Sequence, residues 1–172
     1  IPESISNLSE LKTLYLEKNN LTELPDSFAE LYELTSLTIS NNYLTHLPDG
    51  FGDIGGLFFL DLGYNQLEYL PDSICDLSAL TYFYIFNNNL TDLPECICDL
   101  TVDWDSLDGG NYPFFGSGAN ELCEDIPWCI EESDHFELSL DQFYYSTILD
   151  EPQDCPWTEL EAVASDTTIT LY

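Results

Sequence analysis

The amino-acid sequence predicts an α/β repeat solenoid with a parallel sheet. A unit of 23 residues recurs four times without a gap, and its copies begin at Leu11, Leu34, Leu57 and Leu80. One position of the unit is always asparagine, at Asn19, Asn42, Asn65 and Asn88. Another is always proline, at Pro25, Pro48, Pro71 and Pro94. Periods of this length are typical of stacked units that share one continuous core, so no unit is expected to be stable alone.

Each unit divides into three short parts. It opens with alternating apolar residues, as in "LKTLYL", which favours a strand whose leucines face the core. The repeated asparagine follows where the chain turns, and its side chain can bond backbone groups there. A Leu-Pro segment such as "LPDSFAEL" then returns the chain to the next strand.

The pattern L-x-x-L-x-L-x-x-N-x-L followed by L-P-x-x-[IF]-x-x-L resembles the leucine-rich repeat family, in the 23-residue class common in plant and bacterial proteins. It covers at least residues 1–102. The resemblance implies a horseshoe with a parallel sheet on its concave side and irregular or short helical segments on its convex side.

The period fails after the fourth unit. The segment "DWDSLDGGNYPFFGSGA" precedes "NELCEDIPWCI", in which Asn120 and Pro127 again match the repeated positions. Asn88 and Asn120 are 32 residues apart, nine more than the period, which predicts a fifth repeat that carries an insertion. A sixth strand is expected in "HFELSLDQF", with four inward residues, His135, Leu138, Leu140 and Phe143. His135 is interpreted there as a satisfied core residue rather than a ligand.

These features divide the chain into three parts. Residues 1–102 hold the repeats, residues 103–155 hold degenerate repeats and a cysteine-containing cap, and residues 156–172 form a strand-like tail. The cap is similar to the capping units of secreted leucine-rich repeat proteins, and it is expected to cover the last coil. The tail ends in "SDTTITLY", whose β-branched residues favour a strand.

The six cysteines predict disulfides and therefore an extracellular location. They are Cys75, Cys96, Cys98, Cys123, Cys129 and Cys155. Zinc is less favoured because histidine occurs only at His46 and His135. Cys123 with Cys129 is the preferred pair. The others allow either Cys75–Cys98 with Cys96–Cys155 or Cys75–Cys96 with Cys98–Cys155, and sequence does not settle the connectivity.

The charge balance excludes several classes of protein. The chain has 33 acidic residues and only two basic ones, Lys12 and Lys18, for a formal net charge of −31. Such a surface does not bind nucleic acid, and its self-repulsion predicts a fold that salt stabilises. No stretch approaches the roughly 20 apolar residues of a membrane span.

Aromatic residues gather between the leucines of the third and fourth units, on the expected concave face. An exposed cluster of this kind is typical of interfaces, which predicts recognition of another protein or a glycan. Alternatively, the rings simply stack across neighbouring strands. The candidate binding residues are Tyr15, Phe59, Tyr64, Tyr82, Tyr84 and Phe86.

The two ends of the stack suggest a second use. The first unit, "IPESISNL", starts partway through the repeat, and both lysines lie close to it. The leading hypothesis is a secreted, non-enzymatic subunit that associates with its own copies head to tail, with strand addition by the tail, into an open filament. A longer repeat array explains the abrupt start equally well. The expected contacts are Ile1, Ile5, Leu8, Lys12, Lys18, Thr168, Thr170 and Tyr172.

Other candidate sites are weaker. Asp103, Asp105 and Asp108 offer oxygen ligands for calcium, but Asp108 stands where an EF-hand needs glycine, which favours a solvated loop. Glycosylation sequons occur at Asn7, Asn20 and Asn89. The sequence shows no nucleophile and base that form a recognisable constellation, so neither an enzyme nor a cofactor is expected.

Overall fold

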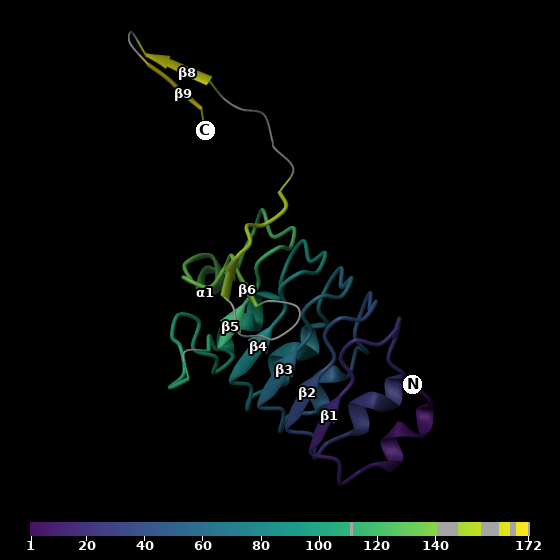
Figure 1. Ribbon diagram of the computed structural model, residues 1–172. Helices are drawn as coiled ribbons and strands as arrows, with labels where there is room; N and C mark the ends of the chain where they lie inside the picture. Colours follow the sequence, from purple (N-terminus) through teal and green to yellow (C-terminus); the bar gives the residue numbers. More distant parts are fainter. Residues whose placement is uncertain (111, 141–147, 156–161, 166–167, 172) are drawn as a thin grey trace.

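The computed structural model describes residues 1–110, 112–140, 148–155, 162–165 and 168–171. Its coils stack in chain order and place one short strand each in a parallel sheet (Figure 1). The sheet order is β1-β2-β3-β4-β5, and the strands are β1 (Thr13–Tyr15), β2 (Ser36–Thr38), β3 (Phe59–Asp61), β4 (Tyr82–Tyr84) and β5 (Phe115–Gly116). The predicted solenoid with a parallel sheet is confirmed.

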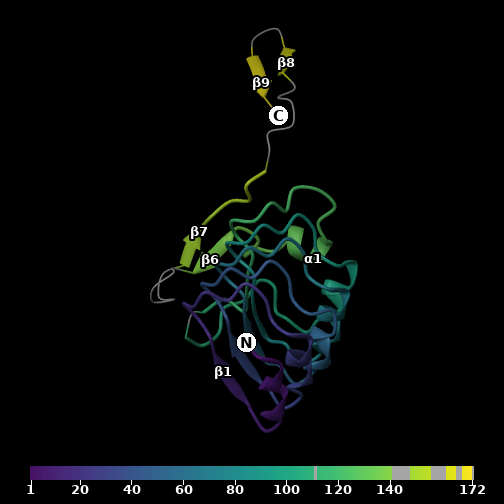
Figure 2. The same ribbon diagram turned by 90° about the vertical axis from the view of Figure 1, so that its right-hand side faces the viewer.

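The Leu-Pro segments form short helices on the side of the coils opposite the sheet (Figure 2). Proline fixes the backbone angle just before most of these helices, and an apolar residue such as Phe28 or Ile74 points from them into the core. The 3-10 helices are η1 (Glu3–Asn7), η2 (Asp26–Glu30), η3 (Phe51–Asp53), η4 (Asp72–Asp76) and η5 (Glu95–Asp99), and one α-helix follows, α1 (Trp128–Glu131). The expectation of a short-helical convex side is confirmed.

The repeated asparagines are buried and join each coil to the one before it. Asn65 Oδ1 accepts a hydrogen bond from Leu44 N at 3.1 Å. Its Nδ2 donates to the carbonyl oxygens of Leu62 in its own coil, at 3.0 Å, and of Ile39 in the preceding coil, at 3.2 Å. Buried backbone groups need such partners, so the ladder satisfies groups that the turns would otherwise leave unpaired.

Asn120 continues this ladder beyond the insertion. Its Oδ1 accepts from Leu90 N at 3.1 Å, and its Nδ2 donates to Ile85 O at 3.0 Å. The same two contacts are made by Asn88 with the coil before it. The fifth repeat with an insertion is therefore confirmed.

Gly52 in η3 gives a first test of this packing. A methyl group placed there would lie 1.8 Å from Ser73 O in η4, because the two short helices are in close contact. Gly52→Ala is therefore expected to lower the free energy of unfolding by about 1–3 kcal/mol, the usual cost of overpacking. Urea unfolding measures the difference. Gly109→Ala is the matched control, because no atom of the described residues lies within 4 Å of a methyl group there, and equal midpoints for the two variants would contradict the packing.

The sixth strand expected in "HFELSLDQF" is confirmed for Leu138–Leu140, but it does not continue the parallel sheet. β6 (Leu138–Leu140) pairs antiparallel with β7 (Ile148–Asp150), and this pair lies beside the end of the sheet rather than extending it (Figure 1). Leu138 and Leu140 pack on the outer, concave side of the sheet, and Phe143 lies outside the described residues. His135 is buried as expected, but it is not satisfied, because its Nδ1 has no hydrogen-bond partner among the described residues.

Two glycines explain why the cap folds back over the sheet. Gly116 and Gly118 occupy outward-facing positions of the fifth coil. Gly118 N donates to Leu138 O at 2.9 Å. A methyl group on Gly116 would lie 2.9 Å from Leu138 O, and one on Gly118 would lie 2.5 Å from Glu137 O. The missing side chains therefore leave room for the backbone of the cap.

Three disulfides join successive layers and correct most of the expected pairings. The bonded pairs are Cys75–Cys96, Cys98–Cys129 and Cys123–Cys155, with Cα–Cα distances of 5.9, 5.7 and 5.6 Å. Cys75–Cys96, one of the open alternatives, is confirmed. The preferred pair Cys123–Cys129 is wrong, and so are Cys75–Cys98, Cys96–Cys155 and Cys98–Cys155.

The direction of the side chains accounts for these errors. Residues at the same position of successive coils project in parallel, so Cys75 and Cys98 do not face each other, whereas a disulfide needs converging Cβ atoms. In both bonds between short helices, a cysteine four positions after one proline meets a cysteine two positions after the next proline.

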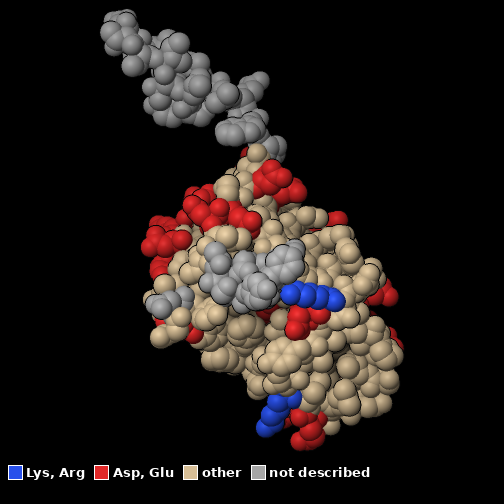
Figure 3. All heavy atoms as spheres, in the orientation of Figure 1, with Lys and Arg blue, Asp and Glu red and all other residues tan. Residues whose placement is uncertain are grey.

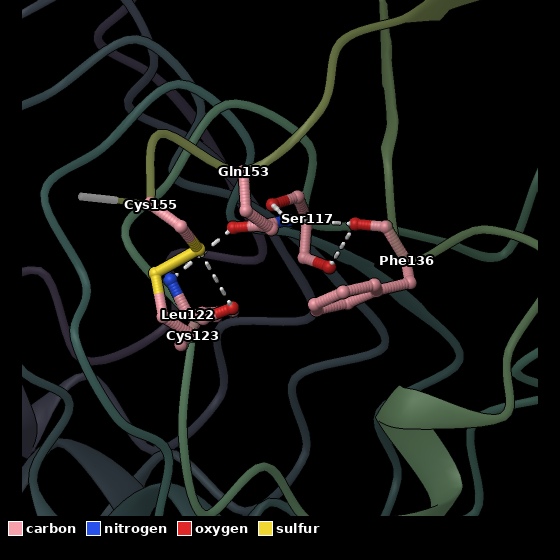
Figure 4. Close-up of a disulfide and its surroundings, with 6 residues drawn as sticks. All are labelled: Ser117, Leu122, Cys123, Phe136, Gln153 and Cys155. Carbon is pink, nitrogen blue, oxygen red and sulfur yellow. Dashed lines mark hydrogen bonds between the residues drawn. A yellow bond between two sulfur atoms is a disulfide. The ribbon is translucent and has the colours of Figure 1, made fainter. Parts of the chain in front are cut away.

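The third disulfide and Gln153 fasten the end of the cap to the last coil (Figure 4). Gln153 Nε2 donates to the carbonyl oxygens of Ser117 and Phe136, both at 3.0 Å. Its Oε1 accepts from Leu122 N at 3.4 Å. The end of the cap is thus tied covalently at Cys155 and by the hydrogen bonds of Gln153 with Ser117, Leu122 and Phe136.

The tail forms a separate hairpin of β8 (Ala162–Ser165) and β9 (Thr168–Leu171). The strand expected near the end of the chain is confirmed for Thr168–Leu171, whose partner here is β8 of the same chain. Thr168 and Thr170 lie on β9, and Tyr172 lies outside the described residues. Within the described part of the chain, no helix is long and apolar enough to cross a membrane.

Candidate functional site

The aromatic residues on the concave side are only partly exposed, which corrects the expected surface. Tyr84 and Phe86 are 2% and 0% exposed, because Leu138 and Leu140 of β6 cover them. The alternative of rings stacked across strands is confirmed for this part of the sheet. Between neighbouring coils, ring centroids lie 5.7 Å apart for Phe59–Tyr84 and 5.6 Å apart for Tyr64–Phe86. Tyr84 and Phe86 of the same coil lie 5.8 Å apart.

A pocket of about 320 Å³ remains open beside this covered region, and we call it the concave hollow. The sheet forms its floor, the insertion after Val102 forms one wall, and β6 forms another. Its lining residues are Thr38, Phe59, Asp61, Tyr82, Tyr84, Asp108, Tyr112 and Leu140.

Two tyrosine hydroxyls hold the insertion against the sheet. Tyr82 OH donates to Asp108 Oδ2 at 2.8 Å, and Tyr84 OH donates to Pro113 O at 2.6 Å. Burial raises the pKa of both tyrosines, and the hydrogen bond to Asp108 raises that of Tyr82 further. Both hydroxyls therefore stay protonated and keep donating at neutral pH.

Asp108 is fixed in its charged form. Its Oδ1 accepts from Tyr112 N at 2.9 Å and from Gly110 N at 2.7 Å. The bond from Tyr112 N and the bond from Tyr82 OH hold the pKa of this carboxyl below its ordinary value, because both favour the anion. The wall of the hollow thus carries a positioned negative charge.

Asp61 places a second carboxylate in the floor. It is only 1% exposed, and its Oδ1 accepts from Gly63 N at 3.0 Å. The hollow therefore combines aromatic faces with two carboxylates from different parts of the chain. Aromatic faces beside positioned carboxylates are suited to binding.

The predicted binding residues separate into three groups. Phe59, Tyr82 and Tyr84 line the hollow. Tyr64 and Phe86 instead support the cap, with Tyr64 OH donating to Leu140 O at 2.9 Å. Tyr15 stands apart on β1 with 67% of its side chain exposed.

Sequence reasoning missed the part of the hollow that the cap and insertion supply. The residues not predicted to bind there are Thr38, Asp61, Asp108, Tyr112 and Leu140. A signal was present, because alternation in "FGSGAN" leaves two outward positions of the fifth coil without side chains. Such bare positions indicate that another backbone approaches closely.

The calcium candidates bond backbone donors instead. Asp103 Oδ1 accepts from Ser106 N at 3.1 Å, and Asp105 Oδ1 accepts from Asp134 N at 3.0 Å. Asp108 lines the concave hollow. Among the described residues no group of three or more His, Cys, Asp or Glu side chains could hold a metal ion.

The expected assembly residues near the N-terminus differ in exposure, whereas the expected glycosylation residues are all exposed. Ile1 and Ile5 pack partly against the core, whereas Leu8 is 51% exposed. Lys12 and Lys18 are exposed. The sequon asparagines are exposed as well, at Asn7, Asn20 and Asn89.

The buried His135 predicts how the stability of the fold changes with pH. Burial lowers its pKa, against the opposing effect of Asp105, Asp134 and Asp103, so the folded chain holds it neutral more readily than the unfolded chain does. Between its folded pKa and about 6.5 the unfolded state binds more protons, so stability is expected to fall as the pH drops through that window. Urea midpoints at about pH 7.5 and 5.5 measure the change. His135→Gln should show a smaller drop, and an equal drop in both proteins would contradict the assignment.

Comparison with known proteins gives the following matches. The leucine rich repeat family model matches residues 2–44 and 33–90, together 89 of the 172 residues. A leucine-rich repeat protein of Leptospira interrogans is similar with a TM-score of 0.57 at 23% identity, over 70% of this chain and 34% of that chain. The resemblance noted in the sequence is therefore confirmed. A search of curated proteins gives no match.

Two receptor structures are also similar. A TDR receptor is 32% identical with a TM-score of 0.58, over 70% of this chain and 20% of that chain. The plant peptide hormone receptor RGFR1, solved in complex with RGF2, is 26% identical with a TM-score of 0.60, over 70% of this chain and 19% of that chain. The chain thus spans about a third or less of the length of all three structures.

Proposed function

The chain belongs to the leucine-rich repeat family, and on that premise we propose that it is a non-enzymatic extracellular module that recognises a protein partner through the concave hollow. Proteins of this family generally act by protein–protein interaction rather than by catalysis. The observation that carries the proposal is the hollow itself, a pocket of about 320 Å³ on the concave side in which four of the eight described lining residues are aromatic.

The chemistry of the hollow supports binding of a partner. Phe59 and Tyr82 are half-buried and Tyr112 is exposed, so their rings offer apolar surface while the sheet and the insertion hold them in place. Rigid aromatic side chains in concave pockets are frequent hot spots of protein interfaces. The similar receptor RGFR1 was solved in complex with RGF2.

The cysteines support the extracellular location. The chain has three disulfides, and none of its described cysteines is free. Disulfides persist in oxidising compartments and are rare in the reducing cytosol.

Selection from a display library of short random peptides tests the proposal. The selection is run in about 0.5 M NaCl, where the screening length is roughly 4 Å and diffuse attraction to the acidic surface is weak. Enriched peptides should bind Phe59→Ala at least about tenfold more weakly than the parent chain. Tyr69→Ala is the matched control, because Tyr69 is exposed outside the hollow. Equal binding to Phe59→Ala would overturn the proposal, and a glycan array probed in parallel tests the glycan alternative.

Self-association is a second candidate, and the first coil favours it. Leu11, Leu14, Leu16 and Leu21 are only partly buried, and β1 has no neighbour on its outer side among the described strands. Another repeat of the same polypeptide or another copy could continue the stack there. Sedimentation velocity over a range of concentrations in about 0.15 M salt tests for self-association. A monomer at every concentration would remove this candidate.

A further inference from the structure

We propose that the concave hollow receives a single cationic side chain, a guanidinium or ammonium group, of the partner protein. This inference rests on the proposed function and adds to it the chemistry of the group that is recognised. The aromatic faces, the two carboxylates and the size of the hollow support it independently of one another.

Aromatic rings surround the hollow on several sides. The ring centroids of Phe59 and Tyr82 are 5.6 Å apart, and those of Phe59 and Tyr84 are 5.7 Å apart. Tyr112 adds a fourth ring from the insertion. The faces of such rings carry negative electrostatic potential and attract cations that come within about 6 Å of the centroid.

Two carboxylates make the hollow negatively charged. Asp108 is held in place by three hydrogen bonds and remains ionised, and Asp61 is buried in the floor. None of the described residues that line the hollow is lysine, arginine or histidine. The ionised Asp108 therefore offers a cation a fixed, charged hydrogen-bond acceptor beside the aromatic faces.

The size and the surroundings agree with this occupant. A pocket of about 320 Å³ lies at the lower end of the range for ligand sites, which suits one long side chain rather than a larger molecule. Figure 3 shows acidic side chains gathered over the cap, whereas both blue side chains and a few acidic ones lie over the first coils. A basic segment is therefore steered toward the end of the sheet where the hollow lies.

NMR titration with N-acetyl-arginine amide tests the inference, with N-acetyl-citrulline amide as the neutral probe of nearly equal shape. The titration is run in about 0.5 M NaCl to screen diffuse charge. We expect the arginine probe to bind about tenfold more tightly than the citrulline probe and to shift the ring signals of Phe59 and Tyr82. Equal affinities for the two probes would overturn the inference.

Two substitutions that remove the same charge distinguish binding in the hollow from diffuse attraction to the acidic surface. Asp108→Asn keeps an oxygen that can accept from the backbone, and it should weaken binding of the arginine probe about tenfold. Asp99→Asn removes an equal charge from an exposed position at the end of η5 and should change binding less than about twofold. Equal losses in both variants would mean that diffuse charge is responsible and would overturn the inference.

Tyr112→Leu keeps the test valid if Asp108→Asn loosens the insertion. Leucine preserves apolar bulk at this exposed position but removes the ring, so the preference for arginine over citrulline should fall at least about threefold. An unchanged preference would count against the aromatic contribution and overturn the inference as stated.

The display selection distinguishes the two proposals. Enriched peptides that depend on Phe59 but bind equally well after their lysines and arginines are replaced by neutral isosteres would overturn only the cationic preference. Enriched peptides that do not depend on Phe59 would overturn the proposed function itself.

Discussion

Replacing Asn65 by alanine is expected to lower the free energy of unfolding by about 4 kcal/mol. The side chain is buried and serves four backbone groups, because its Oδ1 accepts from Leu44 N and its Nδ2 donates to the carbonyl oxygens of Ile39, Leu62 and Gly63. Each buried group left without a partner costs about 1–3 kcal/mol, and alanine cannot replace any of these bonds. Chemical denaturation followed by circular dichroism measures the loss.

Asn19 provides a control at the same position of the first coil. Its Nδ2 donates to the carbonyl oxygens of Leu16 and Glu17, but the side chain is exposed. Water can replace these partners, so Asn19→Ala should cost less than about 1 kcal/mol. Similar losses for both variants would show that burial of the asparagine ladder does not stabilise the solenoid.

Replacing both Cys123 and Cys155 by serine is expected to cost about 3–4 kcal/mol and to open the concave hollow. The bond closes a loop with a sequence separation of 32 residues, and loop-closure entropy predicts a loss of this size. The cap that it fastens also carries Leu138 and Leu140, so its release would expose Tyr84 and Phe86. Thermal unfolding measures the stability, and iodination mapped by mass spectrometry measures the exposure of Tyr84.

The serine pair at Cys75 and Cys96 is the matched control. This disulfide joins η4 to η5 on the convex side, far along the coil from the hollow, with a sequence separation of 21. Its loss should reduce stability but leave Tyr84 protected and peptide binding intact. Exposure of Tyr84 in this variant, or protection in the Cys123 and Cys155 variant, would contradict the role assigned to the cap.

The regular part of this fold could be predicted because its contacts repeat. The 23-residue step sets Thr13 beside Ser36, Ser36 beside Phe59 and Phe59 beside Tyr82. In these regular coils Asn42, Asn65 and Asn88 each likewise accept a hydrogen bond from a backbone N–H 21 residues earlier in the chain. A correct assignment of strand, turn and core residues in one unit therefore predicts the same elements in the next unit.

The concave hollow could not be predicted in the same way, because its contacts occur once. Tyr82 OH meets Asp108 across the insertion, and Tyr64 OH meets Leu140 across 76 residues. No periodic pattern contains these pairs. The outward aromatic residues were found, but whether they face water depended on a cap whose strand β6 pairs with β7 instead of continuing the sheet.

The disulfides were partly predictable from the repeat. The same offset from proline generates Cys75–Cys96 and Cys98–Cys129, so a rule was present in the sequence. It was hidden because stacking of identical positions, which holds for the strands, does not hold for side chains on the short helices.

Photo-cross-linking tests the central claim, recognition through the concave hollow, most directly. An enriched peptide that carries a benzoylphenylalanine beside its basic residue is irradiated with the chain, and the cross-linked residues are identified by mass spectrometry. We expect cross-links at residues of the hollow, above all Phe59, Tyr82 and Tyr112. Cross-links confined to the short helices η2 to η4 on the convex side, with none in the hollow, would contradict it.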